Sequence, residues 1–131
     1  MAALSIWHWA VIGLGGGLGA MARFATVNFI NRLHGSQFPL GTLSVNVVGS
    51  FIMGVAFVFF TIKFQQLPSG YKSFVMVGLL GAFTTFSSFA LETLSLIQQH
   101  YFTIALLYIA ASITACLVAV LAGYVLGKFI F

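Results

Sequence analysis

Four stretches of this chain stay apolar over a length that exceeds the thickness of a membrane's hydrocarbon core. They cover about residues 4–30, 39–62, 73–97 and 102–127, and about 20 apolar residues already suffice for one helical crossing. Because lipid offers the backbone no hydrogen-bond partners, segments of this length are expected to form helices. The sequence therefore predicts an all-α membrane protein, a single domain over residues 1–131 with four transmembrane helices.

Charge is too scarce in this chain to cover a water-facing surface. Only 5% of the residues are charged and 61% are hydrophobic, whereas a soluble domain carries about 25% charged residues. Five Lys and Arg against one acid give a net charge of +4. These cations are scattered along the sequence and form no patch of the kind that binds nucleic acid. We therefore expect the lipid bilayer, and no nucleic acid, as the surroundings of this protein.

The sequence offers no set of side chains for catalysis or for a transition-metal site. Cys116 is the single cysteine, and His8, His34 and His100 lie far apart in the sequence, whereas metal sites need several such ligands at short spacing. Glu92 is the only acid, so no carboxylate pair exists, and no nucleophile is paired with a base. We expect that the protein is not an enzyme.

Glycines in the first span predict a close contact between helices. Gly13 and Gly17 are four residues apart, as are Gly15 and Gly19, so each pair forms a narrow stripe where another helix can approach. The second span has small residues of its own, at Gly41, Gly49, Ser50 and Gly54. We therefore expect the first and second spans to pack closely together.

The charges at the span ends specify orientation only weakly. If both termini are cytoplasmic, the inside holds Lys63, Lys72 and Lys128, and the outer loops hold Arg32. The positive-inside rule acts on such counts, and a bias of three to one is small. Two alternatives remain open: a single orientation with the N-terminus inside, or insertion of the same chain in both orientations.

Polar side chains lie at membrane depth in the first two spans. Thr42, Asn46 and Ser50 are spaced by four residues and share one helix face. This stripe indicates either hydrogen bonding between helices or a pore lining in which the Asn46 amide donates to an anion. Arg23 is either a side chain that reaches to the interface or a vestibule cation that attracts anions or fixes a neighbouring backbone.

The third span contains the segment GAFTTFSSF, Gly81–Phe89, in which four hydroxyls point around the helix. Phe86 and Phe89 share one face with Glu92, since the three are spaced by three residues. A helix break near Gly81–Phe86 would free backbone carbonyls at membrane depth, where hydroxyls can bond some of them. The fourth span places Tyr108, Ser112 and Cys116 on one face, which is also typical of ordinary helix packing.

Three motifs carry a resemblance to a known family. GGGLGAMARF at residues 15–24, PLGTLSVNVVGSF at residues 39–51 and GLLGAFTTFSSF at residues 78–89 resemble the signatures of the Fluc (CrcB) fluoride channels, and the likeness extends over the whole chain. The resemblance implies antiparallel dual-topology homodimers in the cytoplasmic (inner) membrane, where they export fluoride passively. It also implies two fluoride pores at the subunit interface and one central structural Na⁺.

The resemblance also assigns roles to individual residues. It implies a fluoride pore lined by Asn46, Phe86, Ser87, Ser88, Phe89 and Glu92, with Thr42, Tyr108 and Ser112 adding hydroxyls. It makes Arg23 a vestibule residue, and it assigns the backbone carbonyls at Gly81 and Thr84 to the Na⁺. The fourth span departs from the family, because Cys116 stands where Ser is common and Val120 stands where a hydroxyl is expected.

Physical chemistry is consistent with these assignments. Fluoride is strongly hydrated, so a pore must replace its water with donors, and uncharged hydroxyl and amide donors do so without trapping the ion. An aromatic ring has a positive edge that can face an anion. Two other classes remain as hypotheses: a small multidrug transporter, which would need a carboxylate in the first span where this chain has Arg23, and a membrane subunit without transport activity.

Overall fold

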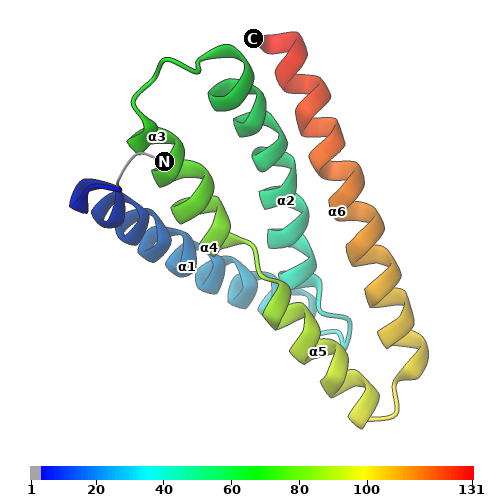
Figure 1. Cartoon of the computed structure of the whole chain (residues 1–131). Coiled ribbons are helices and arrows are strands. Elements are labelled where there is room, and N and C mark those ends of the chain that lie inside the picture. Colours follow the sequence, from blue (N-terminus) through cyan, green and yellow to red (C-terminus); the bar gives the residue numbers. More distant parts are fainter. Residues whose placement is uncertain (1–3) are drawn as a thin grey trace.

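A computed structural model describes residues 4–131. Its four long apolar helical segments are Ile6–His34, Leu40–Lys63, Ser69–Gln98 and Phe102–Ile130, and the described part of the chain contains no strand. The predicted all-α class with four membrane-capable helices is confirmed, and the chain is a multi-pass membrane protein. Successive helices alternate in direction, so that the start of α1 and the end of α6 lie toward the same end of the bundle (Figure 1).

The four spans divide into eight helical elements. The first span is α1 (Ile6–His34), and the second is α2 (Leu40–Phe57) continued by the π-helical η1 (Val58–Lys63). The third contains α3 (Ser69–Lys72), the π-helical η2 (Ser73–Leu80), α4 (Gly81–Phe83) and α5 (Phe86–Gln98), and the fourth is α6 (Phe102–Ile130).

The helices extend beyond the apolar stretches that predicted them. α1 continues to His34 and ends where Gly35 adopts a left-handed conformation, φ 53°, with its N–H bonded to the Asn31 carbonyl. The third helix begins at Ser69, directly after Pro68. Polar residues at span ends can stay helical outside the hydrocarbon region, so hydrophobicity alone does not mark the helix ends.

The third span is interrupted, as predicted, but by threonines rather than by glycine. Thr84 (φ −86°, ψ 157°) and Thr85 (φ −153°, ψ 117°) are extended and separate α4 from α5. Gly81 is helical, with φ −61° and ψ −36°. β-Branched side chains fit extended backbone well, and the Thr85 side chain also caps α5, so this pair suits an interruption.

One glycine stripe of α1 packs against the third span. Gly15 and Gly19 are buried, and a Cβ at Gly15 would lie 2.5 Å from the carbonyl oxygen of Phe74. A Cβ at Gly19 would collide with the Leu79 carbonyl, whereas Gly13 and Gly17 have nothing within 4 Å. The expected close contact of α1 with the second span is also present: a Cβ at Gly41 would lie 2.8 Å from the Val27 carbonyl oxygen.

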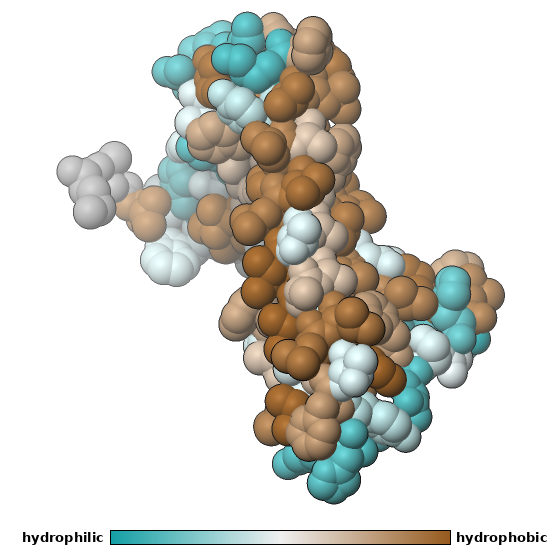
Figure 2. Space-filling model, turned by 90° about the vertical axis from the view of Figure 1, so that its right-hand side faces the viewer, coloured by the Kyte–Doolittle hydropathy of each residue, from teal (hydrophilic) through white to brown (hydrophobic). Residues whose placement is uncertain are grey.

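The second span packs against the fourth through another pair of glycines. A Cβ at Gly54 would collide with the Val120 carbonyl, and one at Gly123 would collide with the Phe51 carbonyl. Such close backbone approach is how helices associate where lipid removes the hydrophobic drive. Apolar side chains cover the middle of the outer face and hydrophilic residues gather toward its two ends (Figure 2), as a membrane-spanning bundle requires.

Candidate functional site

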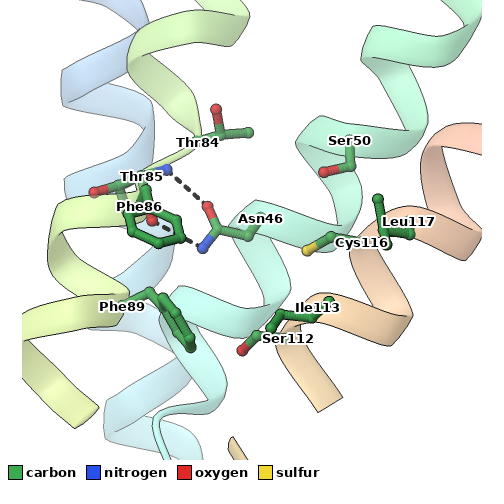
Figure 3. Close-up of a pocket in the computed structure, with 10 residues that line it drawn as sticks. All are labelled: Asn46, Ser50, Thr84, Thr85, Phe86, Phe89, Ser112, Ile113, Cys116 and Leu117. Carbon is green, nitrogen blue, oxygen red and sulfur yellow. Dashed lines mark hydrogen bonds between the residues drawn. The ribbon is translucent and has the colours of Figure 1, made fainter. Parts of the chain in front are cut away.

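Asn46 of α2 is hydrogen-bonded to the backbone of Thr85 at the interruption of the third span. The Thr85 N–H donates to Asn46 Oδ1 at 2.7 Å, and Asn46 Nδ2 donates to the Thr85 carbonyl at 3.0 Å (Figure 3). One amide thus satisfies both polar groups of an extended residue that lipid would leave unbonded. This is interhelical hydrogen bonding, the first of the two interpretations of the polar stripe.

Thr85 also begins the helix that follows the interruption. Its hydroxyl oxygen accepts a hydrogen bond from the Ser88 N–H at 3.1 Å, which makes Thr85 the N-cap of α5. The same hydroxyl donates to Ser88 Oγ at 3.1 Å and lies 3.3 Å from Ser87 Oγ. Serine and threonine are common at the N-cap because their side-chain oxygen accepts from a backbone N–H of the first turn that has no carbonyl partner in the helix.

These contacts change which carbonyls are bonded. In an uninterrupted α-helix the N–H of residue i bonds the carbonyl of residue i−4, so Thr85 would bond Gly81 and Ser88 would bond Thr84. Instead, the Thr85 N–H goes to Asn46 and the Ser88 N–H goes to the Thr85 hydroxyl. The carbonyls of Gly81 and Thr84 are thereby released from the helical ladder.

Arg23 bonds a third carbonyl at the interruption. Its Nε donates to the Ala82 oxygen at 3.0 Å, and the side chain is partly buried. Thr84 turns back onto α4 and donates its Oγ1 to the Leu80 carbonyl at 3.0 Å. Of the alternatives for Arg23, the structure has the one in which it fixes a neighbouring backbone. This leaves the terminal nitrogens of the guanidinium as donors.

A groove of about 360 Å³ lies between α5 and α6, with α2 at its back (Figure 3). Its lining comprises Asn46, Ser50, Thr84, Thr85, Phe86, Phe89, Ser112, Ile113, Cys116 and Leu117. The rings of Phe86 and Phe89 have centroids 5.4 Å apart. Phe86 is 78% exposed in the single chain while Phe89 is 8% exposed, so the groove is open on the side where Phe86 lies.

Ser112 brings an unused hydroxyl to this groove. Ser112 is buried, and its Oγ is one of two buried side-chain oxygens without a hydrogen-bond partner in the described part of the chain. Ser112 and Cys116, one turn apart on α6, form the groove wall opposite the phenylalanines (Figure 3). A buried hydroxyl without a partner is unusual in a folded protein.

A second cavity, of about 190 Å³, lies on the α1 side of the interruption. Its lining comprises Arg23, Phe24, Val27, Asn28, Thr42, Thr85, Ser88 and Glu92. Glu92 accepts hydrogen bonds from Thr42 Oγ1 at 2.7 Å and from the Tyr108 hydroxyl at 2.6 Å. With their protons directed at the Glu92 carboxylate, the hydroxyls of Thr42 and Tyr108 are not free to donate elsewhere.

The structure brings most, but not all, of the predicted site residues together. The groove collects Asn46, Thr84, Phe86, Phe89 and Ser112, and the second cavity collects Arg23, Thr42, Ser88 and Glu92. Gly81, Ser87 and Tyr108 line neither of these cavities. Tyr108 is fully buried, with Phe38 5.5 Å and Phe89 5.1 Å away between ring centroids.

Thr85 is the residue whose importance the sequence did not reveal. It borders both cavities, caps α5 and pairs with Asn46. In the sequence it is one of four hydroxyl residues in a row of nine, and no spacing separates it from the others. A threonine directly before a helical segment is an N-cap signal, and only that signal distinguishes it.

Comparison with known proteins gives one consistent family. Residues 10–124 match the family described as "CrcB-like protein, Camphor Resistance (CrcB)". A "Fluoride-specific ion channel FluC" of Hahella chejuensis is 44% identical over 127 residues, which is 97% of this chain and 99% of that protein. Proteins of the same name from Magnetococcus marinus (47% over 121 residues; 92% and 98%) and Coxiella burnetii (37% over 118 residues; 90% and 95%) are also similar. The expected resemblance is confirmed, and the chain belongs to the CrcB family.

Proposed function

We propose that this chain is a fluoride channel of the cytoplasmic membrane that lets fluoride leave the cell down its electrochemical gradient. The observation that supports it most directly is the groove, in which phenyl rings, an amide and a spare hydroxyl meet at membrane depth without any charged side chain. The similar proteins are named as fluoride-specific ion channels. Ion channels are not enzymes, so these names agree with the expectation that the chain performs no catalysis.

In the proposed pathway fluoride exchanges its water for donors along the groove. An amide NH₂ has two N–H bonds, and Asn46 uses one of them on the Thr85 carbonyl, so the other is available to the ion. The Ser112 hydroxyl is a further donor, since it has no partner within the described residues. The rings of Phe86 and Phe89 offer their positive edges. Uncharged donors bind the ion weakly enough to let it leave.

We further propose that a second copy in antiparallel orientation closes the groove. A lone copy would expose Phe86 together with the polar groups of Asn46 and Thr84 to lipid, which satisfies no hydrogen bonds. A two-fold axis would place two such grooves at one interface, giving two pores per dimer. The weak charge bias between the two ends of the bundle is consistent with insertion in both orientations.

The released carbonyls at the interruption fit a structural Na⁺. Backbone carbonyl oxygens are hard, uncharged ligands of the kind that bind alkali cations, and those of Gly81 and Thr84 have lost their helical donors. In an antiparallel pair each copy would contribute both oxygens. When bound, the ion would supply positive charge near the groove and offset the cost of an anion at depth.

Arg23 and the second cavity form the proposed vestibule. The guanidinium keeps donors free after its bond to the Ala82 carbonyl, and it lines the same cavity as Ser88 and Thr85. A cation at that position raises the local concentration of small anions. Thr42 and Tyr108 then act indirectly, by holding the Glu92 carboxylate with hydrogen bonds.

Fluoride efflux from liposomes tests the proposal. Liposomes that contain the purified protein should release fluoride faster than empty ones, and Phe86→Ile should lower the rate at least about tenfold, or about 1.4 kcal/mol. Phe129→Ile is the matched control, because Phe129 is 85% exposed and lies outside the groove, so its rate should be unchanged. Efflux no faster than from empty liposomes, with folded protein, would refute a fluoride channel.

A further inference from the structure

The end of the bundle that carries all three lysines holds a separate cavity. Its volume is about 270 Å³, and its lining comprises Phe60, Thr61, Phe64, Gln65, Leu67, Ser69 and Lys72. It lies where the second span ends at Lys63 and the third begins at Ser69. The cavity is therefore at the membrane edge and shares no lining residue with the groove or with the cavity beside Arg23.

The lysines at this end of the bundle have no acidic side chain as a partner. Lys63, Lys72 and Lys128 stand in the last turns of η1, α3 and α6, and all three are exposed. Glu92 is the only acidic side chain in the sequence. It belongs to α5, beyond the interruption, and is bonded to Thr42 and Tyr108. An anion that neutralises the lysines must therefore come from outside the chain's own side chains.

The cavity has donors that suit phosphate oxygens. Lys72 contributes an ammonium group, and Gln65 contributes an amide that keeps one free N–H beside its bond to the Ile62 carbonyl. The Thr61 hydroxyl is buried and has no hydrogen-bond partner among the described residues. Ser69 is held in place because its Oγ lies 2.6 Å from Nε2 of His8 on α1. This contact ties Ser69, at the start of the third span, to the first span.

Part of the cavity lining is aromatic and firmly packed. Phe60 and Phe64 line the cavity, and Phe59 packs against both, with ring centroids 4.9 Å and 4.6 Å away. Phe131 closes the group, 5.0 Å from Phe59. Apolar walls at the lipid boundary suit the glycerol and upper acyl segments of a phospholipid better than they suit a free, fully hydrated phosphate.

We propose that this cavity binds the headgroup of an anionic phospholipid. Lys72 binds the phosphate, Thr61 and Gln65 donate to its oxygens, and the phenylalanines contact the glycerol region. Basic pockets between membrane helices bind such headgroups in general. If the protein pairs antiparallel, each leaflet receives one such site, so both copies are anchored alike. The inference does not depend on fluoride transport.

Lipid binding by the purified full-length protein tests this inference. Native mass spectrometry after titration with phosphatidylglycerol or phosphatidylcholine should show preferential retention of phosphatidylglycerol. Lys72→Gln should weaken that binding about fivefold, which corresponds to about 1 kcal/mol for one lysine at the membrane surface. Lys128→Gln is the matched control, since it removes the same charge from the same end, outside the cavity, and should change binding less than about twofold because of screening.

Four results would overturn the inference. Equal losses of phosphatidylglycerol binding in both lysine variants would mean that the lysines attract anionic lipid without a defined site. Equal retention of phosphatidylglycerol and phosphatidylcholine by the parent protein would show that the cavity does not select an anionic headgroup. Displacement by inorganic phosphate at a similar concentration would identify a free-anion site instead. If Lys72→Gln fails to fold, Thr61→Val is the second variant, because it keeps the side-chain shape and removes the hydroxyl. It should lower the retention of phosphatidylglycerol and leave that of phosphatidylcholine unchanged. Unchanged retention of phosphatidylglycerol would also overturn the inference.

Discussion

Asn46 combines two roles in one side chain at the scale of the residue. Its oxygen accepts from the Thr85 N–H and one of its N–H bonds goes to the Thr85 carbonyl, so it stabilises the extended backbone at the interruption. The sequence indicated a polar stripe and left its purpose open between packing and ion contact. The packing role is confirmed by the structure, and the contact with fluoride stays a prediction.

Two substitutions at Asn46 test these roles. Asn46→Ala leaves both polar groups of Thr85 without partners and should destabilise the protein by about 1–3 kcal/mol per unsatisfied group, measured by thermal unfolding. Asn46→Asp keeps the acceptor for the Thr85 N–H, but its carboxylate cannot donate to the Thr85 carbonyl, so this variant should also unfold below the parent temperature. The negative charge that it places in the groove should lower fluoride efflux at least about tenfold, or about 1.4 kcal/mol.

Ser50→Ala is the control for both measurements. Ser50 lines the same groove one turn from Asn46, and it makes no side-chain hydrogen bond to any described residue, so its loss should leave unfolding unchanged. Efflux at the parent rate in Asn46→Asp would remove Asn46 from the ion pathway and keep only its structural role.

At the scale of the element, the two glycine stripes of α1 have different surroundings although the sequence makes them look alike. Gly15 and Gly19 lie against η2, and Gly13 and Gly17 have nothing near their Cβ positions. Both stripes have the same spacing of four. Which stripe receives the neighbouring helix depends on the rotation of α1 about its axis, and that is set by the packing of the whole bundle.

Alanine substitutions test this difference. A Cβ at Gly19 would collide with the backbone carbonyl of Leu79, so Gly19→Ala should destabilise the protein by about 1–3 kcal/mol, as other overpacking changes do. Gly17→Ala meets open space and improves helix propensity, so it should be neutral or stabilise by up to about 1 kcal/mol. Thermal unfolding of the purified variants gives both values, and equal costs would contradict the packing of α1 described above.

At the scale of the whole molecule, the charge bias between the two ends of the bundle is three lysines against Arg32. The bias is small because the chain has so few charges, and orientation in the membrane depends on such differences. An antiparallel pair needs both orientations, so a strong bias should abolish transport even where each chain folds.

Shifting the bias tests the antiparallel pair. A variant with Gln66→Arg and Arg32→Gln has four cations at the end that carries the lysines and none at the other end. It should insert in one orientation and conduct little fluoride. A partner variant with Lys63→Gln, Lys128→Gln and Gln98→Arg has one cation at the end that carries the lysines and two at the other end. It therefore favours the opposite orientation. Co-expression of the two variants should restore fluoride efflux, and a tag on the same terminus of both variants should then be found on both sides of the membrane. Full efflux from the first variant alone would argue against antiparallel pairing.

Much of the fold follows from the sequence because it depends on local composition. Four apolar stretches predicted four helices, and the interruption expected near Gly81–Phe86 in the third lies at Thr84 and Thr85. The helix ends were less predictable, since polar residues such as Arg32 and His34 remain helical beyond the apolar region. The motifs identified the family, and the comparisons agree.

Long-range pairing is the part that only the tertiary structure decided. The sequence by itself determined how many times the chain crosses the membrane and which polar residues lie at depth, because hydrophobicity over about 20 residues decides both. It did not determine that Asn46 pairs with Thr85, that Arg23 pairs with Ala82, or that Thr42 and Tyr108 direct their protons to Glu92. Those partners are 16 to 59 residues apart in the chain, and they meet because each buried polar group must find the nearest available partner once the helices have packed.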